Sequence, residues 1–206
     1  MRPNDERSAE LMQALVAGRQ VALKELMSLW EAPLLRFIFR YVQREAEARD
    51  LVQETFVRVY LKRECFRPGA SFSTWAFTIA ANLCRNHRRW QGRHPTSSLD
   101  DVTSGMPAGH DLLVSPECCP DQATVQNERL MALRTAIADL THELRTTLLL
   151  YEYEEMSYRD IAEVVGCSEK GVESRLARAR ARLRKTLAPH LNAEPATRPM
   201  LVPLRS

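Results

Sequence analysis

The sequence predicts an all-α protein with two small helical domains joined by a long acidic linker. Hydrophobic residues recur at three- and four-residue spacing along both halves of the chain, which is the period of an amphipathic helix. No segment shows the strict polar–apolar alternation of a strand. Between the halves, residues 94–123 are rich in Gly, Pro, Ser and Asp and have no sustained period, which indicates a linker. We therefore expect domains at 8–93 and 124–188 and a flexible tail over 189–206.

Charge is distributed unevenly along the 206 residues. The net charge is only +3, but the segment between His94 and Glu128 contains no Lys or Arg. Six acidic residues lie in that segment or at its end, so the flanking halves are strongly basic. Basic surfaces of this kind favour nucleic acid as a partner.

Two further features indicate a cytoplasmic protein. The chain has no apolar run of about 18 residues and no hydrophobic signal core at its start, so neither membrane insertion nor secretion is supported. The five cysteines form no CxxC pair, and their odd number suggests reduced thiols. Cys84 with His87, or the pair Cys118 and Cys119, leaves zinc binding or redox sensing open. Because these spacings match no tetrahedral site, we expect no metal and no cofactor.

The first half is predicted to hold four helices. Residues 8–18 form a short helix, and residues 23–41 form a longer one in which Pro33 marks a kink or a restart. A third helix, over 45–63, buries one face and presents a compact polar patch on another. The patch consists of Asp50, Gln53 and Glu54. It has no His, Ser or Lys companion, so a docking patch or a plain solvated face is favoured over catalysis.

An aromatic turn leads into the fourth helix, over 72–90. The turn carries Pro and Gly, and the helix ends in a tail that is rich in Arg and Asn and contains no acidic residue. Aromatic rings beside such a surface are typical of single-stranded nucleic-acid binding. The candidate contacts are Phe66, Phe72, Asn82, Arg85, Asn86 and Arg89. The alternative is that Phe66 and Phe72 fill the core.

The second half is predicted to end in a helix-turn-helix over 157–184. Two helices precede it, one from about residue 124 and one that Thr141 can cap. Ser157 and Asp160 have the spacing of a capping box at the start of the first helix of the motif. Gly166 suits the left-handed conformation that ends this helix, and Ser168 can cap the next one.

The last helix has two distinct faces. The packing face consists of Val172, Leu176, Ala179 and Leu183. The opposite face consists of Lys170, Ser174, Ala177, Arg178, Ala181 and Lys185. Residues 168–187 contain seven Lys or Arg and two Glu, a balance of +5 that suits phosphate, and the small side chains allow close approach to a major groove. The alternative is a solvated face that complements the helix dipole.

Two motifs thus occur in a fixed order: DLVQETF on a helix, followed by the aromatic turn and basic helix, and then a terminal helix-turn-helix with an Arg-rich helix. In that order, and with QGRHPTSS at the start of the linker, the chain resembles bacterial extracytoplasmic-function (ECF) sigma factors of the sigma-E type over residues 8–188. The resemblance implies a sigma-2 domain, a sigma-4 domain and no active site. It also implies core RNA polymerase, promoter DNA and an anti-sigma factor as partners.

The resemblance assigns a role to each candidate surface. Asp50, Gln53 and Glu54 would dock on the clamp helices of the beta-prime subunit, and the second domain would reach the beta flap. The loop over 66–73, which includes Ser71, would capture a flipped base of the minus-10 element, while Asn82 and Asn86 would contact the strand. The minus-35 contacts would be Lys170, Glu173, Ser174, Arg175 and Arg178. Since Gly171 and Glu173 depart from residues that are frequent in the family, no minus-35 sequence follows by analogy.

Two other functions fit part of the pattern. A free-standing helix-turn-helix regulator would bind duplex DNA without polymerase. A nuclease or recombinase would need clustered carboxylates or a nucleophilic Ser or Tyr in a cleft. The sequence presents neither, so we expect no enzymatic activity.

Overall fold

The structure, a computed structural model, describes residues 3–94 and 120–191, and the side chains of 5–94 and 127–189. Within these ranges the chain forms eight α-helices, one short 3-10 helix and no strand, which confirms the predicted all-α class. The predicted linker and tail lie mostly outside the described residues, as do Cys118 and Cys119.

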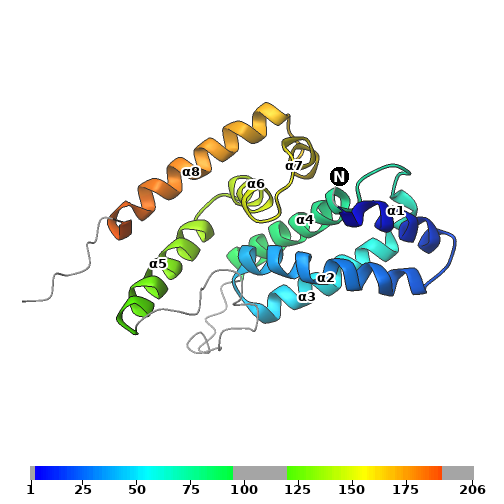
Figure 1. The fold of residues 1–206 in the computed structure, drawn as a ribbon, viewed down its shortest axis with the longest axis horizontal. Helices are drawn as coiled ribbons and strands as arrows, with labels where there is room; N and C mark the ends of the chain where they lie inside the picture. The colour runs from blue at the N-terminus through cyan, green and yellow to red at the C-terminus, as the bar shows by residue number, and fades with distance from the viewer. Residues whose placement is uncertain (1–2, 95–119, 192–206) are drawn as a thin grey trace, which may run out of the picture.

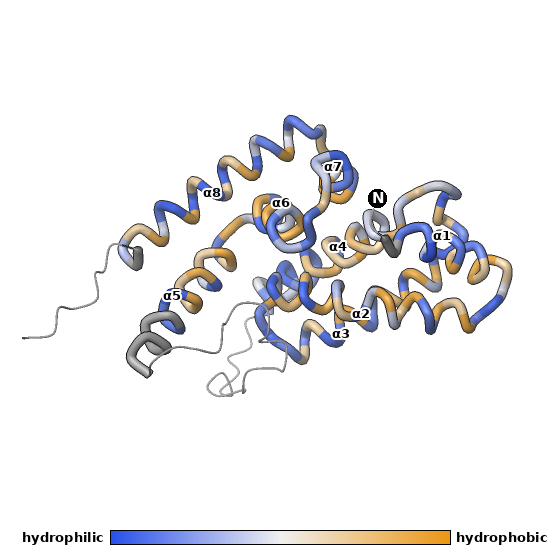
Figure 2. The backbone as a smooth tube through the Cα atoms, in the orientation of Figure 1, coloured by the Kyte–Doolittle hydropathy of each residue, from blue (hydrophilic) through white to orange (hydrophobic). Residues whose placement is uncertain are grey.

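The first four helices form one bundle (Figure 1). Their bounds are α1 (Pro3–Val16), α2 (Val21–Val42), α3 (Glu45–Leu61) and α4 (Phe72–Arg93), with the 3-10 helix at Arg63–Cys65. In Figure 2 hydrophobic positions recur along α2 and α4, as expected of helices that share a core.

α2 supplies the centre of this core. Six of its side chains are at most 2 % exposed: Leu26, Trp30, Leu34, Phe37, Ile38 and Tyr41. The Trp30 ring packs against Phe72 and Phe77, with centroids 5.5 and 6.3 Å away. α2 continues through Pro33, so the predicted restart does not occur. Buried residues on both sides of the proline compensate for the backbone hydrogen bond that it removes.

α1 begins earlier than the predicted residue 8, at Pro3. Proline is favoured in the first turn of a helix, because its missing N–H would be unpaired there anyway. The early start places Asp5, which is 3 % exposed, against the beginning of α4. Its carboxylate accepts the backbone N–H of Ser73 at 2.9 Å and the hydroxyls of Ser71 and Ser73 at 3.1 and 3.0 Å. An anionic group at this helix end is also favoured by the helix dipole.

The last four helices form a second group. Their bounds are α5 (Pro120–Ala138), α6 (His142–Glu152), α7 (Tyr158–Val165) and α8 (Glu169–Leu191). In Figure 1, α8 is a long helix that extends past α6, with α7 at one end and α5 towards the other. α6 is the central helix of the group, since Leu144, Leu148, Leu149 and Leu150 are all at most 9 % exposed. α8 runs to Leu191, beyond the predicted end near residue 187.

The cap of α6 differs from the prediction. Thr141 occupies the capping position, but its side chain makes no capping hydrogen bond. Instead, the carboxylate of Glu143 bonds to its own backbone N–H, which is the main cause that lowers the pKa of Glu143. The negative charge that complements the start of α6 therefore comes from the helix itself.

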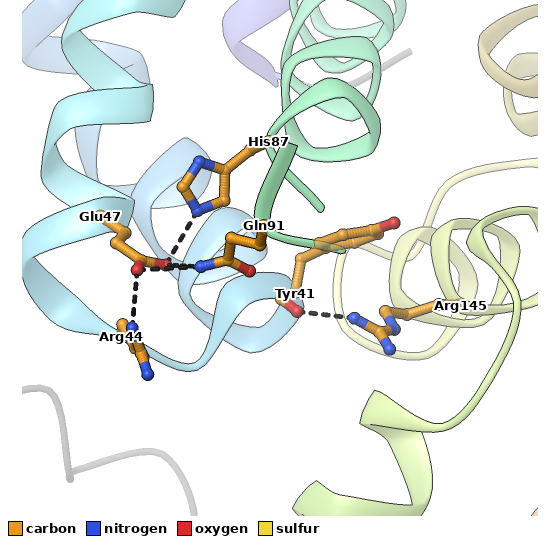
Figure 3. Close-up of polar contacts among 6 residues, drawn as sticks. All are labelled: Tyr41, Arg44, Glu47, His87, Gln91 and Arg145. Atoms are coloured by element: carbon orange, nitrogen blue, oxygen red, sulfur yellow. Dashed lines mark hydrogen bonds and ion pairs between the residues drawn. The ribbon is translucent and has the colours of Figure 1, made fainter. Parts of the chain in front are cut away.

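Hydrogen bonds join the two helical groups. The Tyr41 hydroxyl lies 2.8 Å from Nδ1 of His142, and Nη1 of Arg145 donates to the Tyr41 carbonyl oxygen at 2.9 Å. The latter contact appears in Figure 3. On α4, Nη1 of Arg88 donates to the carbonyl oxygen of Leu140 at 2.8 Å. The two groups are therefore in direct contact.

A charged contact adds to this junction. The Arg40 guanidinium on α2 lies over the ring of Tyr153, 4.2 Å from its centroid, and 3.9 Å from the Glu154 carboxylate. The Glu154 side chain is 4 % exposed, so the carboxylate is buried beside a cation. Burial of this pair depends on the two helical groups staying together.

Candidate functional site

The helix-turn-helix begins at a capping box on α7. The Ser157 hydroxyl accepts the backbone N–H of Asp160 at 3.2 Å and donates to its carboxylate at 2.6 Å. At the other end, Gly166 adopts φ +64°, a left-handed conformation that glycine takes without steric cost. Both predicted signals are confirmed. They fix where α7 starts and ends, and hence the direction in which the chain enters α8.

α8 exposes its basic face. Ser168 caps the helix, since its hydroxyl accepts the N–H of Gly171 at 3.2 Å. The predicted packing face is confirmed: Val172, Leu176 and Ala179 are at most 1 % exposed. The opposite side is exposed at Lys170, Glu173, Ser174, Ala177, Arg178, Ala181 and Lys185. An exposed, basic helix face with small side chains near its centre suits entry into a major groove.

Arg175 differs from the other candidates on α8. It is only partly exposed, and its Nη1 is buried without a hydrogen-bond partner. The pKa of Glu143 on α6 is lowered mainly by the hydrogen bond to its own backbone N–H, and to a lesser extent by the nearby charge of Arg175. Arg175 therefore lies on the side of α8 that faces α6.

At the start of α4 the structure changes the predicted roles. Ser71 caps the helix by accepting the N–H of Thr74 at 3.2 Å. Phe72 is fully buried, Phe66 is 9 % exposed, and their ring centroids are 6.2 Å apart. Neither ring offers a free face to a base, so the alternative applies: both fill the core. Exposed residues in this loop are confined to 67–69 and do not include an aromatic.

The other α4 candidates share one exposed stripe. We call this stripe the α4 stripe; it consists of Asn82, Arg85, Asn86 and Arg89. At 100° per residue these four positions fall within an arc of about 100°. Nη2 of Arg85 donates to Oδ1 of Asn82 at 3.0 Å, so the polar groups lie side by side. The stripe is a continuous surface of amide and guanidinium groups.

One carboxylate holds the basic half of α4 against α3. Glu47 is hydrogen-bonded to Arg44 at 3.1 Å, to Nε2 of His87 at 2.9 Å and to the Gln91 amide at 3.0 Å. Figure 3 shows these side chains converging on Glu47. At 100° per residue His87 and Gln91 lie on the side of α4 opposite to Arg89, so this cluster fixes the rotation of α4 that leaves the stripe exposed.

The polar patch on α3 continues into an apolar one. Asp50 and Gln53 are exposed, and the Glu54 side chain is 43 % exposed. Glu54 pairs with Arg58 at 2.7 Å. Further along the same face lie Val57 and Leu61, which are 50 % and 69 % exposed. We call these five residues, Asp50, Gln53, Glu54, Val57 and Leu61, the α3 patch.

The apolar half of the α3 patch was not predicted from the sequence. A signal was available, because Val57 and Leu61 follow Asp50 and Glu54 at helical spacing and so lie on the polar face. Exposed apolar side chains in a row are typical of a surface that packs against another helix.

The described residues hold no group of His, Cys, Asp and Glu arranged as a metal site. Cys84 is fully buried, and burial raises the pKa of its thiol far above the usual value. A buried thiol of this kind is unreactive. Its neighbour in the proposed pair, His87, is bonded to Glu47 instead.

Known families match both helical groups. The family described as Sigma-70 region 2 matches residues 26–94, and Sigma-70, region 4 matches residues 130–183. Together the two matches cover more than half of the chain. The chain is an ECF sigma factor of the sigma-70 family. This family comprises transcription initiation factors rather than enzymes.

Several relatives resemble this sigma factor over most of their length. The RNA polymerase sigma-H factor of Pseudomonas aeruginosa is 34% identical over 189 residues, which cover 90% of this chain and 96% of the relative. The ECF RNA polymerase sigma-E factor of Haemophilus influenzae is 32% identical, covering 87% and 94%. Among solved structures, the sigma factor RpoE of Bartonella quintana, in complex with the anti-sigma factor NepR, is 27% identical with a TM-score of 0.59, covering 80% of this chain and 96% of that one.

The matched regions contain all three exposed surfaces. The α3 patch and the α4 stripe lie within the region 2 match, and the basic face of α8 from residue 170 to residue 181 lies within the region 4 match. In the part of the chain that the structure describes, no helix is long and apolar enough to cross a bilayer.

Proposed function

We propose that this sigma factor directs core RNA polymerase to promoters through three separate surfaces, one for each step. The observation that carries the proposal is that a single chain exposes two DNA-suited helices and one docking helix, each outside its core. The first domain, residues 8–93, docks on core polymerase and opens the DNA. Residues 94–123 are the linker. The second domain, residues 124–188, binds duplex DNA.

The α3 patch is the proposed docking surface for the beta-prime clamp helices. It combines carboxylates and an amide at one end with exposed Val57 and Leu61 at the other. A partner helix that offers basic residues and an apolar stripe would satisfy both halves. Charged groups at the rim would then set orientation, while the apolar half supplies most of the affinity.

The α4 stripe is the proposed minus-10 surface. Its amides and guanidinium groups are suited to base edges and phosphates of a strand that has left the duplex. The loop at 67–69 is exposed beside the capped start of α4 and is the remaining candidate for capturing a base. Phe66 and Phe72 are buried, so they would anchor that loop to the core rather than stack on DNA bases.

The basic face of α8 is the proposed minus-35 surface. Lys170, Ser174 and Arg178 lie at its centre, and small Ala177 and Ala181 allow close approach. Glu173 is exposed next to them, where a carboxylate can accept from a cytosine amino group. The second domain is also proposed to contact the beta flap of the polymerase.

An anti-sigma factor is a further proposed partner. The Bartonella quintana relative is held by one, and this chain shares its fold over 80% of its length. As a factor that works on bacterial polymerase, the protein is expected to act in the cytoplasm and to have no catalytic activity of its own.

Run-off transcription with purified core polymerase tests the proposed function. The wild-type chain should give specific transcripts, and Asp50→Ala with Glu54→Ala should weaken core binding about 30-fold, since two interface contacts of about 1 kcal/mol each amount to about 2 kcal/mol. Glu6→Ala with Glu128→Ala removes the same charge from exposed positions elsewhere and should bind as wild type.

Two results would contradict the proposal. Full-strength initiation by the Asp50 and Glu54 double variant would contradict the docking role of these two carboxylates in the α3 patch. Tight and specific binding to duplex DNA in a gel shift without polymerase, with no run-off transcript when polymerase is added, would instead identify a free-standing regulator.

A further inference from the structure

A notch opens where the two helical groups meet. It has a volume of about 270 Å³ and is lined by Tyr41 of α2, three arginines of α4, and Thr141 and His142 at the start of α6. The arginines are Arg85, Arg88 and Arg89. This volume is below the roughly 300 to 1,000 Å³ that is typical of sites for drug-sized ligands, so the notch suits a small group.

The lining is rich in hydrogen-bond donors and holds no carboxylate. Arg85, Arg88 and Arg89 are spaced so that α4 turns all three towards one side, and each is exposed. Nη1 of Arg88 is already held by the Leu140 carbonyl oxygen, which fixes this side chain at the notch. Three cations without a local counter-ion repel one another, and a bound anion would relieve that repulsion.

His142 adds a neutral donor from the second group. Burial is the main cause that lowers its pKa to about 4, and the charges of Arg85, Arg145 and Arg88 lower it further, against the opposing effect of Glu143. His142 is therefore uncharged at neutral pH, and its Nδ1 lies against the Tyr41 hydroxyl. With Nδ1 as the acceptor of that bond, Nε2 carries the proton.

The nearest carboxylate does not fill the notch. Glu143 follows His142, but its carboxylate is engaged with its own backbone N–H and with the Thr141 hydroxyl. The attraction comes from the guanidinium groups of α4.

We propose that this notch binds a phosphate group and that the bound phosphate holds the two domains together. Guanidinium groups bind phosphate through charge-assisted, often bidentate hydrogen bonds, which makes arginine the favoured residue for this ligand. Arg85 and Arg89 come from the first domain, and Thr141 and His142 come from the second. A phosphate that contacts both sides stabilises the closed arrangement over an open one.

The site overlaps the α4 stripe, because Arg85 and Arg89 belong to both. A phosphate in the notch would therefore occupy two arginines that the proposed function assigns to minus-10 DNA. The binding itself does not depend on that function, since it is measured without polymerase or promoter. A free phosphate ion and a DNA backbone phosphate offer the same chemistry, and the experiment separates them.

Thermal unfolding of the full chain tests the proposal. Inorganic phosphate is compared with chloride at equal ionic strength and pH. If phosphate is bound well above its Kd, the melting temperature of the wild type should rise by about 2 to 4 °C more in phosphate. Arg85→Gln with Arg89→Gln should abolish this difference, whereas Arg67→Gln with Arg93→Gln, an equal charge change at exposed positions outside the notch, should retain it.

The proposed site would be refuted if phosphate changed the melting temperatures of the two double variants equally, or if it gave no specific shift in the wild type. His142→Phe removes the ring N–H that the second domain presents at the notch, so it tests the contribution of that domain and should reduce the shift. Should the shift survive in full, the phosphate would not bridge the domains, and the proposal would fail on that point.

A second measurement identifies the source of the phosphate. Binding of a short fluorescent single strand is measured in phosphate and in chloride at equal ionic strength. Competition by phosphate that disappears in Arg85→Gln with Arg89→Gln would show that the free ion and the DNA backbone use the same arginines. If the strand binds equally in both salts while phosphate still shifts the melting temperature, the notch takes the free ion only. If the strand binds through these arginines and phosphate has no effect, the bridging site is refuted and the arginines serve DNA alone.

Discussion

His142 lies at the junction of the two domains and stays neutral at physiological pH. Burial lowers its pKa from the usual 6.5 to about 4. The unfolded chain therefore takes up a proton below pH 6.5 that the folded chain refuses. Stability from this residue is fully present above pH 6.5 and is lost as the pH falls towards 4.

Replacing His142 should change how stability depends on pH. In His142→Gln the polar contact with Tyr41 can be kept, but no proton is taken up by the unfolded chain at this position. Urea unfolding between pH 6.5 and 4 should show a shallower loss of stability than in the wild type. His94→Gln, at an exposed histidine beyond α4, is the control and should keep the wild-type slope. Equal slopes for all three proteins would contradict the buried, neutral state of His142.

Arg178 is the residue that best separates base recognition from phosphate binding on α8. It is exposed at the centre of the basic face, and its Nε contacts only the Ser174 carbonyl oxygen of its own helix, at 3.3 Å. Arg178→Ala should cost about 1 to 3 kcal/mol of holoenzyme binding and relax the preference at one promoter position. Binding to a set of single-base promoter variants measures both effects.

Arg182 provides the matched comparison for Arg178. It lies one turn further along α8 and is also exposed, but it falls on the flank of the basic face. Arg182→Ala should weaken binding to all promoter variants alike, as expected of a phosphate contact. If Arg178→Ala behaved in this uniform way as well, Arg178 would be a phosphate contact and not a specificity residue.

At the scale of elements, the turn of the helix-turn-helix depends on one glycine. Gly166 has φ +64°, and no atom lies within 4 Å of the position that a Cβ would take. Gly166→Ala therefore meets no clash and costs only the backbone strain, about 1 kcal/mol. The melting temperature of the chain should fall by about 2 to 4 °C.

Gly92 gives the opposite expectation for the same substitution. It lies inside α4, also with open space at its Cβ position, but without a positive φ. Alanine is favoured over glycine within a helix by up to about 1 kcal/mol, so Gly92→Ala should raise the melting temperature slightly. A loss of stability at Gly92, or none at Gly166, would contradict the assigned backbone conformations.

Local signals explain which elements the sequence predicted. The capping box at Ser157 and the packing face of α8 depend on residues three or four positions apart, so the sequence alone contains the information. The burial of Phe72 does not follow from spacing, because its ring packs against Trp30, which lies more than thirty residues away, and Phe66 in turn packs against Phe72.

Long-range contacts also explain what was missed. Asp5 was left outside the first predicted helix, since its partners Ser71 and Ser73 are distant in sequence. The contact of Arg145 with Tyr41 links residues 104 positions apart and gives no local pattern. The exposure of the α4 stripe, the polar half of the α3 patch and the basic face of α8 could be predicted because exposure on a helix follows its period, whereas the contacts at the junction between domains do not.

At the scale of the whole molecule, the closed arrangement conflicts with a two-part promoter. Minus-10 and minus-35 elements are separated by about 25 base pairs, or about 85 Å at roughly 3.4 Å per pair. In this structure α4 contacts α7, and α7 contacts α8, so a single helix lies between the two helices that carry the proposed DNA surfaces, and their separation is much shorter than the promoter spacing. If the α4 stripe binds the minus-10 element and the basic face of α8 binds the minus-35 element, as proposed, the domains must separate before both elements can be bound.

The sequence between the domains permits such a separation. Residues 95–119 could span about 80 to 90 Å if fully extended, at roughly 3.3 to 3.6 Å per residue. Opening breaks the polar interactions that Tyr41, Arg88 and Arg40 make across the junction, and polymerase and promoter would have to compensate for them. Buried apolar residues of both helical groups also belong to one hydrophobic cluster, so polymerase and promoter must offset the loss of that packing as well.

Distances between spin labels measure the opening. Labels at Val21 of α2 and Met131 of α5 occupy exposed positions, 71% and 62% exposed, on different domains. The distance between them should increase when core polymerase and promoter DNA are added, because binding energy at two distant DNA elements is available only to the open form. A pair within the first domain, at Val21 and at exposed His94, which lies outside the α3 patch and the α4 stripe, should keep its distance. An unchanged distance between the domains in a complex that still transcribes would show that the closed form itself is the active one.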